Sequence, residues 1–222
     1  MNYQINFSAL SPYVGQFTQG MLTTTLLSVL TVVLSFLLAI PGVAARVAPT
    51  AWVRGITRVY IDLVRNIPML VLLYMLYFGL AQSGLRLSSF EAGLAGLVIN
   101  STAYVIEIYR GGIEGIKPGQ REAAAALGLG PMATWRHIIL PQAVRIVFPA
   151  LGNQVVGIVL GSSLVMVVAE PDLTFVAFNV GSDTFRYFET FIVVALIYLV
   201  VVQAITLLWR LLGHVLLPVY RT

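Results

Sequence analysis

The sequence predicts an all-α polytopic membrane protein with five transmembrane helices and a helical hairpin between the third and fourth helices. Of its 222 residues, 59% are hydrophobic and only 10% are charged, and the mean hydropathy is +0.91. Soluble domains carry about 25% charged residues, so this composition excludes an ordinary soluble fold. The apolar residues gather in segments of about 20, the length that a helix needs to cross a bilayer. A polar, alanine-rich block separates two of these segments, and a protein that only anchors itself has no need of it.

The five spans are expected at about 20–47, 67–81, 90–109, 148–169 and 188–212, within one membrane domain of residues 1–222. An amphipathic stretch at 53–65 precedes the second span, and we interpret it as a helix that lies at the membrane interface. Asn66-Ile67-Pro68 breaks the chain between the two. No internal repeat is visible, and an odd number of spans argues against the paired inverted halves of many secondary transporters.

The block at 118–142 predicts two short helices joined by a turn. Pro118-Gly119 is a turn signal, and the stretch 120–127, with four consecutive alanines, strongly favours a helix. Gly128 fits the stop of the first helix and Pro131 the first position of the second. Pro141 is expected to end the second helix. Such a hairpin either covers its own helix bundle or docks into another protein.

The distribution of basic residues predicts the orientation of the chain. Eleven of the 13 Lys and Arg residues fall on one side of the predicted spans, and only Arg86 and Arg186 fall on the other. By the positive-inside rule, the N-terminus is outside, and the C-terminus and the 118–142 block are cytoplasmic. The segment between spans four and five is acidic and is expected to be an external loop, with Glu170, Asp172, Asp183 and Glu189. The eleven residues are Arg46, Arg54, Arg58, Arg65, Arg110, Lys117, Arg121, Arg136, Arg145, Arg210 and Arg221.

Several classes of function are excluded by what the sequence lacks. The net charge of +4 is spread over the loops rather than gathered on one face, so nucleic-acid binding is not indicated. There is no cysteine, and His137 and His214 stand alone, so no metal site is expected. The sequence contains neither a phosphate-binding loop nor a plausible pair of nucleophile and base. Any hydrolysis of ATP would therefore require another chain.

Four motifs, in order along the chain, resemble those of ABC-importer permeases of the polar amino acid subfamily. They are Gly20-Met-Leu-Thr-Thr-Thr25, Tyr60-Ile-Asp-Leu-Val-Arg-Asn-Ile-Pro-Met-Leu70, Tyr104-Val-Ile-Glu-Ile-Tyr-Arg-Gly-Gly-Ile113, and Pro118-Gly-Gln-Arg-Glu-Ala-Ala124 with Leu140-Pro-Gln-Ala143. The last block resembles the "EAA loop" of that family. The resemblance covers nearly the whole chain, and it implies a permease for histidine, glutamine, glutamate, arginine or a similar substrate.

The resemblance also implies partners and a place in the cell. It implies a multi-pass subunit of the bacterial cytoplasmic (inner) membrane, paired with itself or with a sister permease. Two ATPase subunits would hold ATP and Mg, this chain would bind no cofactor, and an external solute-binding protein would deliver the substrate. The loop would be the contact with the ATPase, because its small side chains allow close approach. The residues expected to make that contact are Gly119, Gln120, Glu122, Ala123, Ala124, Leu127, Gly128 and Pro141.

Polar residues within two spans are candidates for the path of the substrate, because such residues are costly in a bilayer. Asn100, Tyr104 and Glu107 share one helix face. A structural role is the alternative for Glu107, which has Arg110 or Arg65 as possible ion-pair partners. Arg65, Pro68 and Arg110 are expected to act in structure or gating. The path candidates are Asn100, Ser101, Tyr104 and Glu107 on span three, and Asn153, Gln154, Ser162 and Ser163 on span four.

The sequence departs from the subfamily in span four. Most importers of this subfamily resemble a motif in which Lys is followed by an acidic or polar residue. At these two positions the chain has Leu160 and Gly161. Either the partner permease carries the site, or this chain uses its serines and main chain, or no substrate rests in the membrane. The chain is then an amino acid permease or the substrate-silent half of a heterodimer. An ion-coupled carrier that works alone would depend on Glu107, nearly its only intramembrane charge.

Overall fold

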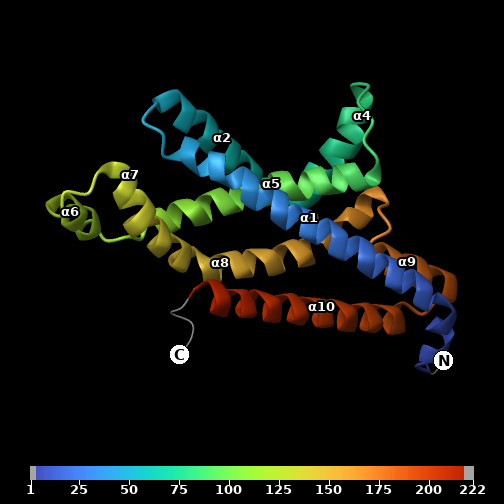
Figure 1. Ribbon diagram of the computed structural model, residues 1–222. Coiled ribbons are helices and arrows are strands. Elements are labelled where there is room, and N and C mark those ends of the chain that lie inside the picture. Colours follow the sequence, from blue (N-terminus) through green and yellow to red (C-terminus); the bar gives the residue numbers. More distant parts are fainter. Residues whose placement is uncertain (1–3, 218–222) are drawn as a thin grey trace.

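The computed structural model describes residues 4–217, which form helices and connecting turns (Figure 1). Arg221, one of the basic residues in the charge count, lies outside the described residues. The α-helices are α1 (Val14–Arg46), α2 (Ala51–Asn66), α3 (Met69–Tyr74), α4 (Leu80–Gln82), α5 (Ser89–Glu114), α6 (Gly119–Ala126), α7 (Pro131–Thr134), α8 (Leu140–Gly161), α9 (Leu173–Thr184) and α10 (Tyr187–Leu216). Two 3₁₀ segments are η1 (Phe7–Tyr13) and η4 (Ser162–Val168), and two π turns are η2 (Met75–Gly79) and η3 (Trp135–Ile139). The prediction of an all-α membrane fold is confirmed.

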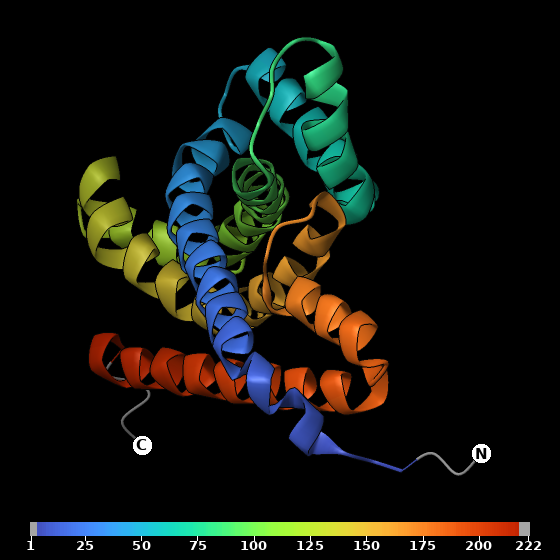
Figure 2. The same ribbon diagram turned by 90° about the vertical axis from the view of Figure 1, so that its right-hand side faces the viewer.

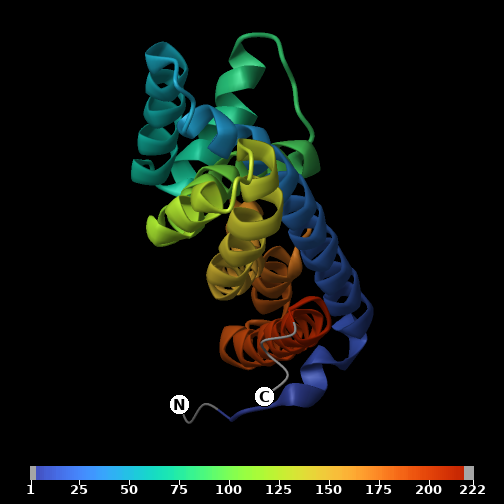
Figure 3. The same cartoon turned by 60° about the vertical axis from the view of Figure 1, so that its left-hand side comes forward.

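Helix α5 occupies the centre of the bundle, and Figure 2 shows it nearly end-on among the other helices. Its most apolar stretch is 56% buried within the chain, whereas that of α10 is only 6% buried. In Figures 1 and 3, α10 lies along one edge and α2 to α4 along the opposite edge, with α5 and α8 between them. The peripheral helix therefore turns most of its apolar surface outward, as a helix in contact with lipid or a partner does.

The amphipathic stretch expected at 53–65 and the second span expected at 67–81 form a pair of helices joined by a sharp bend. Helices α2 and α3–α4 meet at 106°, because Pro68 lacks an N–H and holds Ile67 in an extended conformation. The span expected at 67–81 begins at Met69 and contains the π turn η2. Within residues 4–217, four helices are long and apolar enough to cross a membrane, or five when the bent pair counts as one span.

The prediction that Pro141 ends a helix is wrong. Helical structure is continuous from Pro131 to Val168, through α7, η3, α8 and η4. Pro141 lies at the start of α8, directly after the π turn η3. A wide turn at this point accommodates the missing N–H of proline without ending the helix. The span expected at 148–169 is therefore the later part of a helix that begins in the hairpin.

The other three spans extend beyond their predicted bounds. The span expected at 20–47 is α1, which begins at Val14; that at 90–109 is α5, which runs to Glu114; and that at 188–212 is α10, which runs to Leu216. Hydropathy marks only the apolar centre of a helix, whereas backbone hydrogen bonds continue into polar turns. At the start of α5, for example, Ser88 and Glu91 form a reciprocal capping box.

The acidic segment between spans four and five, which the sequence predicts as an external loop, is largely helical. It forms α9, which packs against α1 and α10, and three of its four acids are buried: Glu170, Asp172 and Glu189. Asp172 caps α9 by accepting a hydrogen bond from Phe175 N at 2.8 Å. Glu170 accepts one from Ser89 Oγ at 2.6 Å, and Glu189 one from Asn6 N at 2.9 Å. These acids join elements of the fold through hydrogen bonds. An acidic residue in this segment can therefore indicate a packing contact as well as exposure to solvent.

Asp172 makes the stability of this corner depend on pH. Its side chain is fully buried, and burial raises the pKa of Asp172 to about 6. Because the folded state holds the proton more tightly than the unfolded chain, the free energy of unfolding should fall as the pH rises from about 4 to about 6, by about 3 kcal/mol. Asp172→Asn keeps an acceptor for Phe175 N and should remove this dependence.

Thermal unfolding of the detergent-solubilised protein between pH 4 and pH 7.5 measures this effect. Asp183→Asn is the matched control, because Asp183 is exposed on the same helix. The prediction fails if the Asp172→Asn variant and the parent protein lose stability in parallel as the pH rises. Tyr198 Oη, at 3.4 Å from Asp172 Oδ2, is the titratable group that faces the carboxylate from α10.

Candidate functional site

The hairpin consists of α6, a tight turn and the continuous helix that begins with α7. The turn contains Gly128 at a φ of +71°, with Gly128 N donating to Ala125 O and Leu129 N to Ala124 O, each at 3.0 Å. These two hydrogen bonds are typical of a helix that ends at a residue in the left-handed conformation. Glycine adopts that conformation at the least cost in energy. Gln142 Nε2 donates to Gln120 Oε1 at 3.2 Å and ties α6 to the first turn of α8. The two arms are thereby held at a defined angle.

Most of the hairpin is free of contact with its own bundle. Among the residues predicted to contact the ATPase, Ala124 is fully buried. The exposed ones are Gly119, Gln120, Glu122, Ala123, Leu127, Gly128 and Pro141. A hairpin that only covers its own helices would bury more of these side chains.

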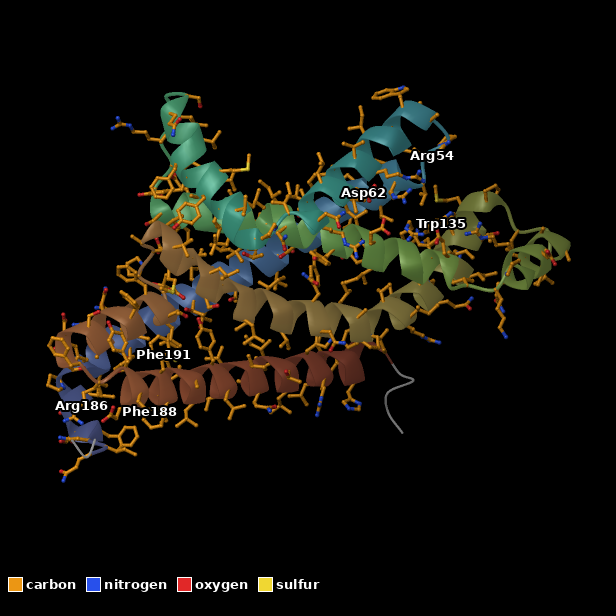
Figure 4. All side chains as sticks on the ribbon, turned by 180° about the vertical axis from the view of Figure 1, so that it is seen from behind. Arg54, Asp62, Trp135, Arg186, Phe188 and Phe191 are labelled. Carbon is orange, nitrogen blue, oxygen red and sulfur yellow. The ribbon has the colours of Figure 1, made fainter. Side chains whose placement is uncertain are left out.

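Two exposed apolar side chains of the hairpin were not singled out from the sequence. Met132 is 79% exposed and Trp135 is 41% exposed, and they join Leu127, which is 77% exposed. Figure 4 shows Trp135 at the hairpin end of the molecule. Exposed apolar groups in a polar loop are typical of a protein–protein contact. Their position as apolar residues in an otherwise polar block was the sequence signal that could have identified them.

The polar face of α5 is organised around Glu107. Its Oε1 accepts from Arg46 Nε at 3.2 Å, and its Oε2 accepts from Arg110 Nη2 at 2.7 Å and Nε at 3.0 Å. Arg110 also pairs with Glu114. The structural alternative for Glu107 therefore has the expected partner in Arg110. The second partner is Arg46 at the end of α1, and sequence spacing along α5 gave no sign of it.

Arg65 does not pair with Glu107. Its guanidinium carbon lies 4.9 Å from the centre of the Tyr104 ring, a cation–π arrangement. Pro68 follows at the break between α2 and α3. Among the path candidates on α5, Ser101 is buried, whereas Asn100 and Tyr104 are partly exposed. The structure thus brings Arg65, Tyr104, Asn100 and Glu107 to one region.

The two serine candidates of span four are engaged by their own backbone. Ser162 Oγ donates to Val159 O and Ser163 Oγ to Leu160 O, both at 2.7 Å, so each hydroxyl bonds to its own helix. Val165, one turn on, belongs to one buried cluster with Leu97 in the N-terminal half of α5. Gln154 is half-buried.

Asn153 lies instead on a cavity of about 340 Å³ between α8 and α10. Its lining also includes Phe148, Gly152, Trp209, Arg210 and His214. Within residues 4–217, no group of three His, Cys, Asp or Glu side chains could hold a metal ion.

Comparison with known proteins identifies the family. Residues 32–216 match the family described as "Binding-protein-dependent transport system inner membrane component". The chain belongs to this family. It is therefore a multi-pass permease subunit of an ABC transporter, and the resemblance found in its motifs is confirmed.

Individual relatives are similar in sequence to this permease over nearly their whole length. It is 40% identical to the probable glutamine ABC transporter permease protein GlnM of Bacillus subtilis, over 90% of this chain and 91% of that one. It is 33% identical to the glutamine transport system permease protein GlnP of Escherichia coli K12, over 93% and 95%. Among solved structures, that of an amino acid ABC transporter with histidines matches with a TM-score of 0.90 and 35% identity, covering 96% of this chain and 100% of that one.

Proposed function

We propose that this permease carries a polar amino acid across the bacterial cytoplasmic membrane as the membrane subunit of an ABC importer. The observation that carries the proposal is the similarity, over at least 90% of the chain, to permeases named for glutamine and to a solved amino acid ABC transporter. An external solute-binding protein delivers the substrate, and two ATPase subunits supply the energy. The ATP and Mg lie on those subunits.

The proposed mechanism is alternating access. Closure of the ATPase dimer around ATP draws the hairpins together, and the spans open outward to accept the substrate. Hydrolysis then resets the bundle to its inward-open form. The continuous helix from the hairpin into α8 supports this mechanism, because it connects Met132 directly to the middle of the membrane.

The proposed orientation places the N-terminus outside and the hairpin in the cytoplasm. In Figure 1 the hairpin, the end of α1 and the end of α10 lie at one end of the molecule, and the start of α1 lies at the other. Lys117, Arg121 and Arg136 lie in or beside the hairpin, and Arg46 and Arg110 lie near the adjoining ends of α1 and α5, which supports a cytoplasmic hairpin. Arg65, which the sequence places with them, lies instead at the break between α2 and α3.

A substrate-silent half of a heterodimer is the second candidate. Leu160 and Gly161 leave span four without the expected cation, and Leu160 is an exposed apolar side chain. The ion-coupled carrier has less support, because both carboxylate oxygens of Glu107 are already bound by arginines.

Uptake into proteoliposomes tests the proposal. The complex would contain the permease, its ATPase, any sister permease and the binding protein, and the substrates would be labelled arginine, histidine, glutamate and glutamine. We expect ATP-dependent uptake of one class of these amino acids. A complex whose ATPase responds to the binding protein but which takes up none of the four would remove amino acids as the substrate.

A further inference from the structure

The break in the second span lies beside the middle of α5. Helix α2 ends at Asn66, and α3 begins at Met69 after two extended residues. On the α2 side of the break, Tyr60 Oη donates to Ile99 O at 2.7 Å, and on the α3 side Met69 packs against the cluster that includes Leu97 of α5. Since α5 crosses the bundle from Ser89 to Glu114, these contacts place the break near its centre. Transporters commonly bind solutes where a helix is interrupted in the membrane.

Arg65 brings a positive charge to this break that no described side chain neutralises. Its guanidinium rests on the Tyr104 ring, and no carboxylate of residues 4–217 forms an ion pair with it within 4.0 Å. Glu107, the nearest acid along α5, is already held by Arg46 and Arg110. A cation at this depth is costly unless it faces water or binds an anion.

Asp62 supplies a negative charge on the same helix, one turn before Arg65. Both side chains are exposed, and they form no ion pair with each other within 4.0 Å. Residues three apart share a helix face, so the two charges lie on one side of α2. Figure 4 shows Asp62 on α2 close to α5. The pair therefore presents one cation and one anion on the same side of α2, without an ion pair between them.

We propose that Arg65 and Asp62 bind the zwitterionic head group of the amino acid substrate. The guanidinium of Arg65 receives the α-carboxylate, and the carboxylate of Asp62 receives the α-ammonium. The Tyr104 ring holds the guanidinium in place, so that less side-chain freedom is lost on binding. This assignment rests on the proposed function, and it gives Arg65 a role in binding, where the sequence predicted a role in structure or gating or an ion pair with Glu107.

The same charges indicate a substrate with an uncharged polar side chain. A cationic side chain would need a second carboxylate near the break, and Glu107 is neutralised by two arginines. An anionic side chain would need a second cation, and Arg58 lies two helical turns from Arg65, about 10 Å along the axis. An amide side chain, as in glutamine, requires neither.

Equilibrium binding of labelled glutamine to the permease–ATPase complex without its binding protein tests the assignment. Arg65→Met and Asp62→Asn should each weaken binding by about 10- to 100-fold, the usual effect of losing a charged hydrogen-bond partner. Arg65→Lys should lie between, because an ammonium keeps the charge but not the two-pronged geometry. Arg58→Met is the matched control and should bind as the parent does. Glutamine should displace the label, whereas glutamine amide and arginine should not.

Three results would overturn the assignment. One is unchanged binding by both Arg65→Met and Asp62→Asn, a second is equal displacement by arginine and glutamine, and a third is no binding to a complex that still performs uptake with its binding protein. The third result would leave the transport function standing, whereas loss of all uptake by the parent complex would remove that function itself. Gel filtration of each variant with the ATPase shows that it is folded, and Asp62→Asn carries the test if Arg65→Met does not assemble.

Discussion

Replacing Glu107 with glutamine should lower the free energy of unfolding by about 3 kcal/mol, because it leaves two partly buried arginines facing each other. Arg46 and Arg110 approach opposite oxygens of the carboxylate, at 3.2 and 2.7 Å. For a chain of this length, such a loss should lower the melting temperature by about 6–12 °C. Thermal unfolding in detergent measures the change.

A second substitution distinguishes repulsion between Arg46 and Arg110 from the simple loss of their contacts with Glu107. Arg46→Met combined with Glu107→Gln removes one of the two cations, while Arg110 keeps Glu114 as its partner. The double variant should therefore be more stable than Glu107→Gln alone. Glu114→Gln is the control, because the side chain of Glu114 is 58% exposed and its loss should matter little. A double variant that is less stable than either single variant would contradict the ion-pair interpretation.

The same variants decide between the two roles that the sequence left open for Glu107. If the residue only joins α1 to α5, the double variant regains both stability and uptake. If it contacts the substrate, uptake stays low although stability returns. The binding assays with Arg65 variants are independent of this result, because Arg65 and Glu107 do not pair in the structure.

The sequence predicts the spans well where a single helix carries a clear apolar centre. The centres of α1, α5 and α10 lie within the expected ranges, because hydropathy and backbone geometry agree there. Asn66-Ile67-Pro68 was also found as a break. The 106° bend itself could not be predicted, since the direction of α3 depends on how Met69 and Leu73 pack against α5.

Two features of the fold could not be predicted from the sequence, because they depend on tertiary contacts. Pro141 is a helix breaker by local rules, but a π turn absorbs it. The acids between spans four and five predict an external loop by composition, yet Asp172 at the start of α9 and Glu189 in the first turn of α10 are buried, because each meets a backbone donor. Within the candidate site, Arg46 could not be assigned to Glu107, since 61 residues separate them in the chain.

The hairpin is expected to fail in binding the ATPase when its exposed apolar side chains become charged. Leu127 and Met132 stand on the two arms, each more than three-quarters exposed. Aspartate at both positions would bury two unpaired charges in the contact and should weaken association by at least about 100-fold. Co-purification of the tagged permease with its ATPase measures this, together with stimulation of ATP hydrolysis by the binding protein.

The control for that experiment is the same chemical change at the other end of the molecule. Leu85→Asp alters a leucine that is 56% exposed between α4 and α5, and it should leave the association intact. Gly128→Asp should also weaken the complex, because a side chain at a φ of +71° strains the turn that sets the angle between the arms. Normal recovery of the ATPase with both the Leu127→Asp/Met132→Asp and the Gly128→Asp variants would show that the subunits meet elsewhere. Loss with these variants but not with Leu85→Asp would locate the contact on the hairpin, and with it the cytoplasmic side of the membrane.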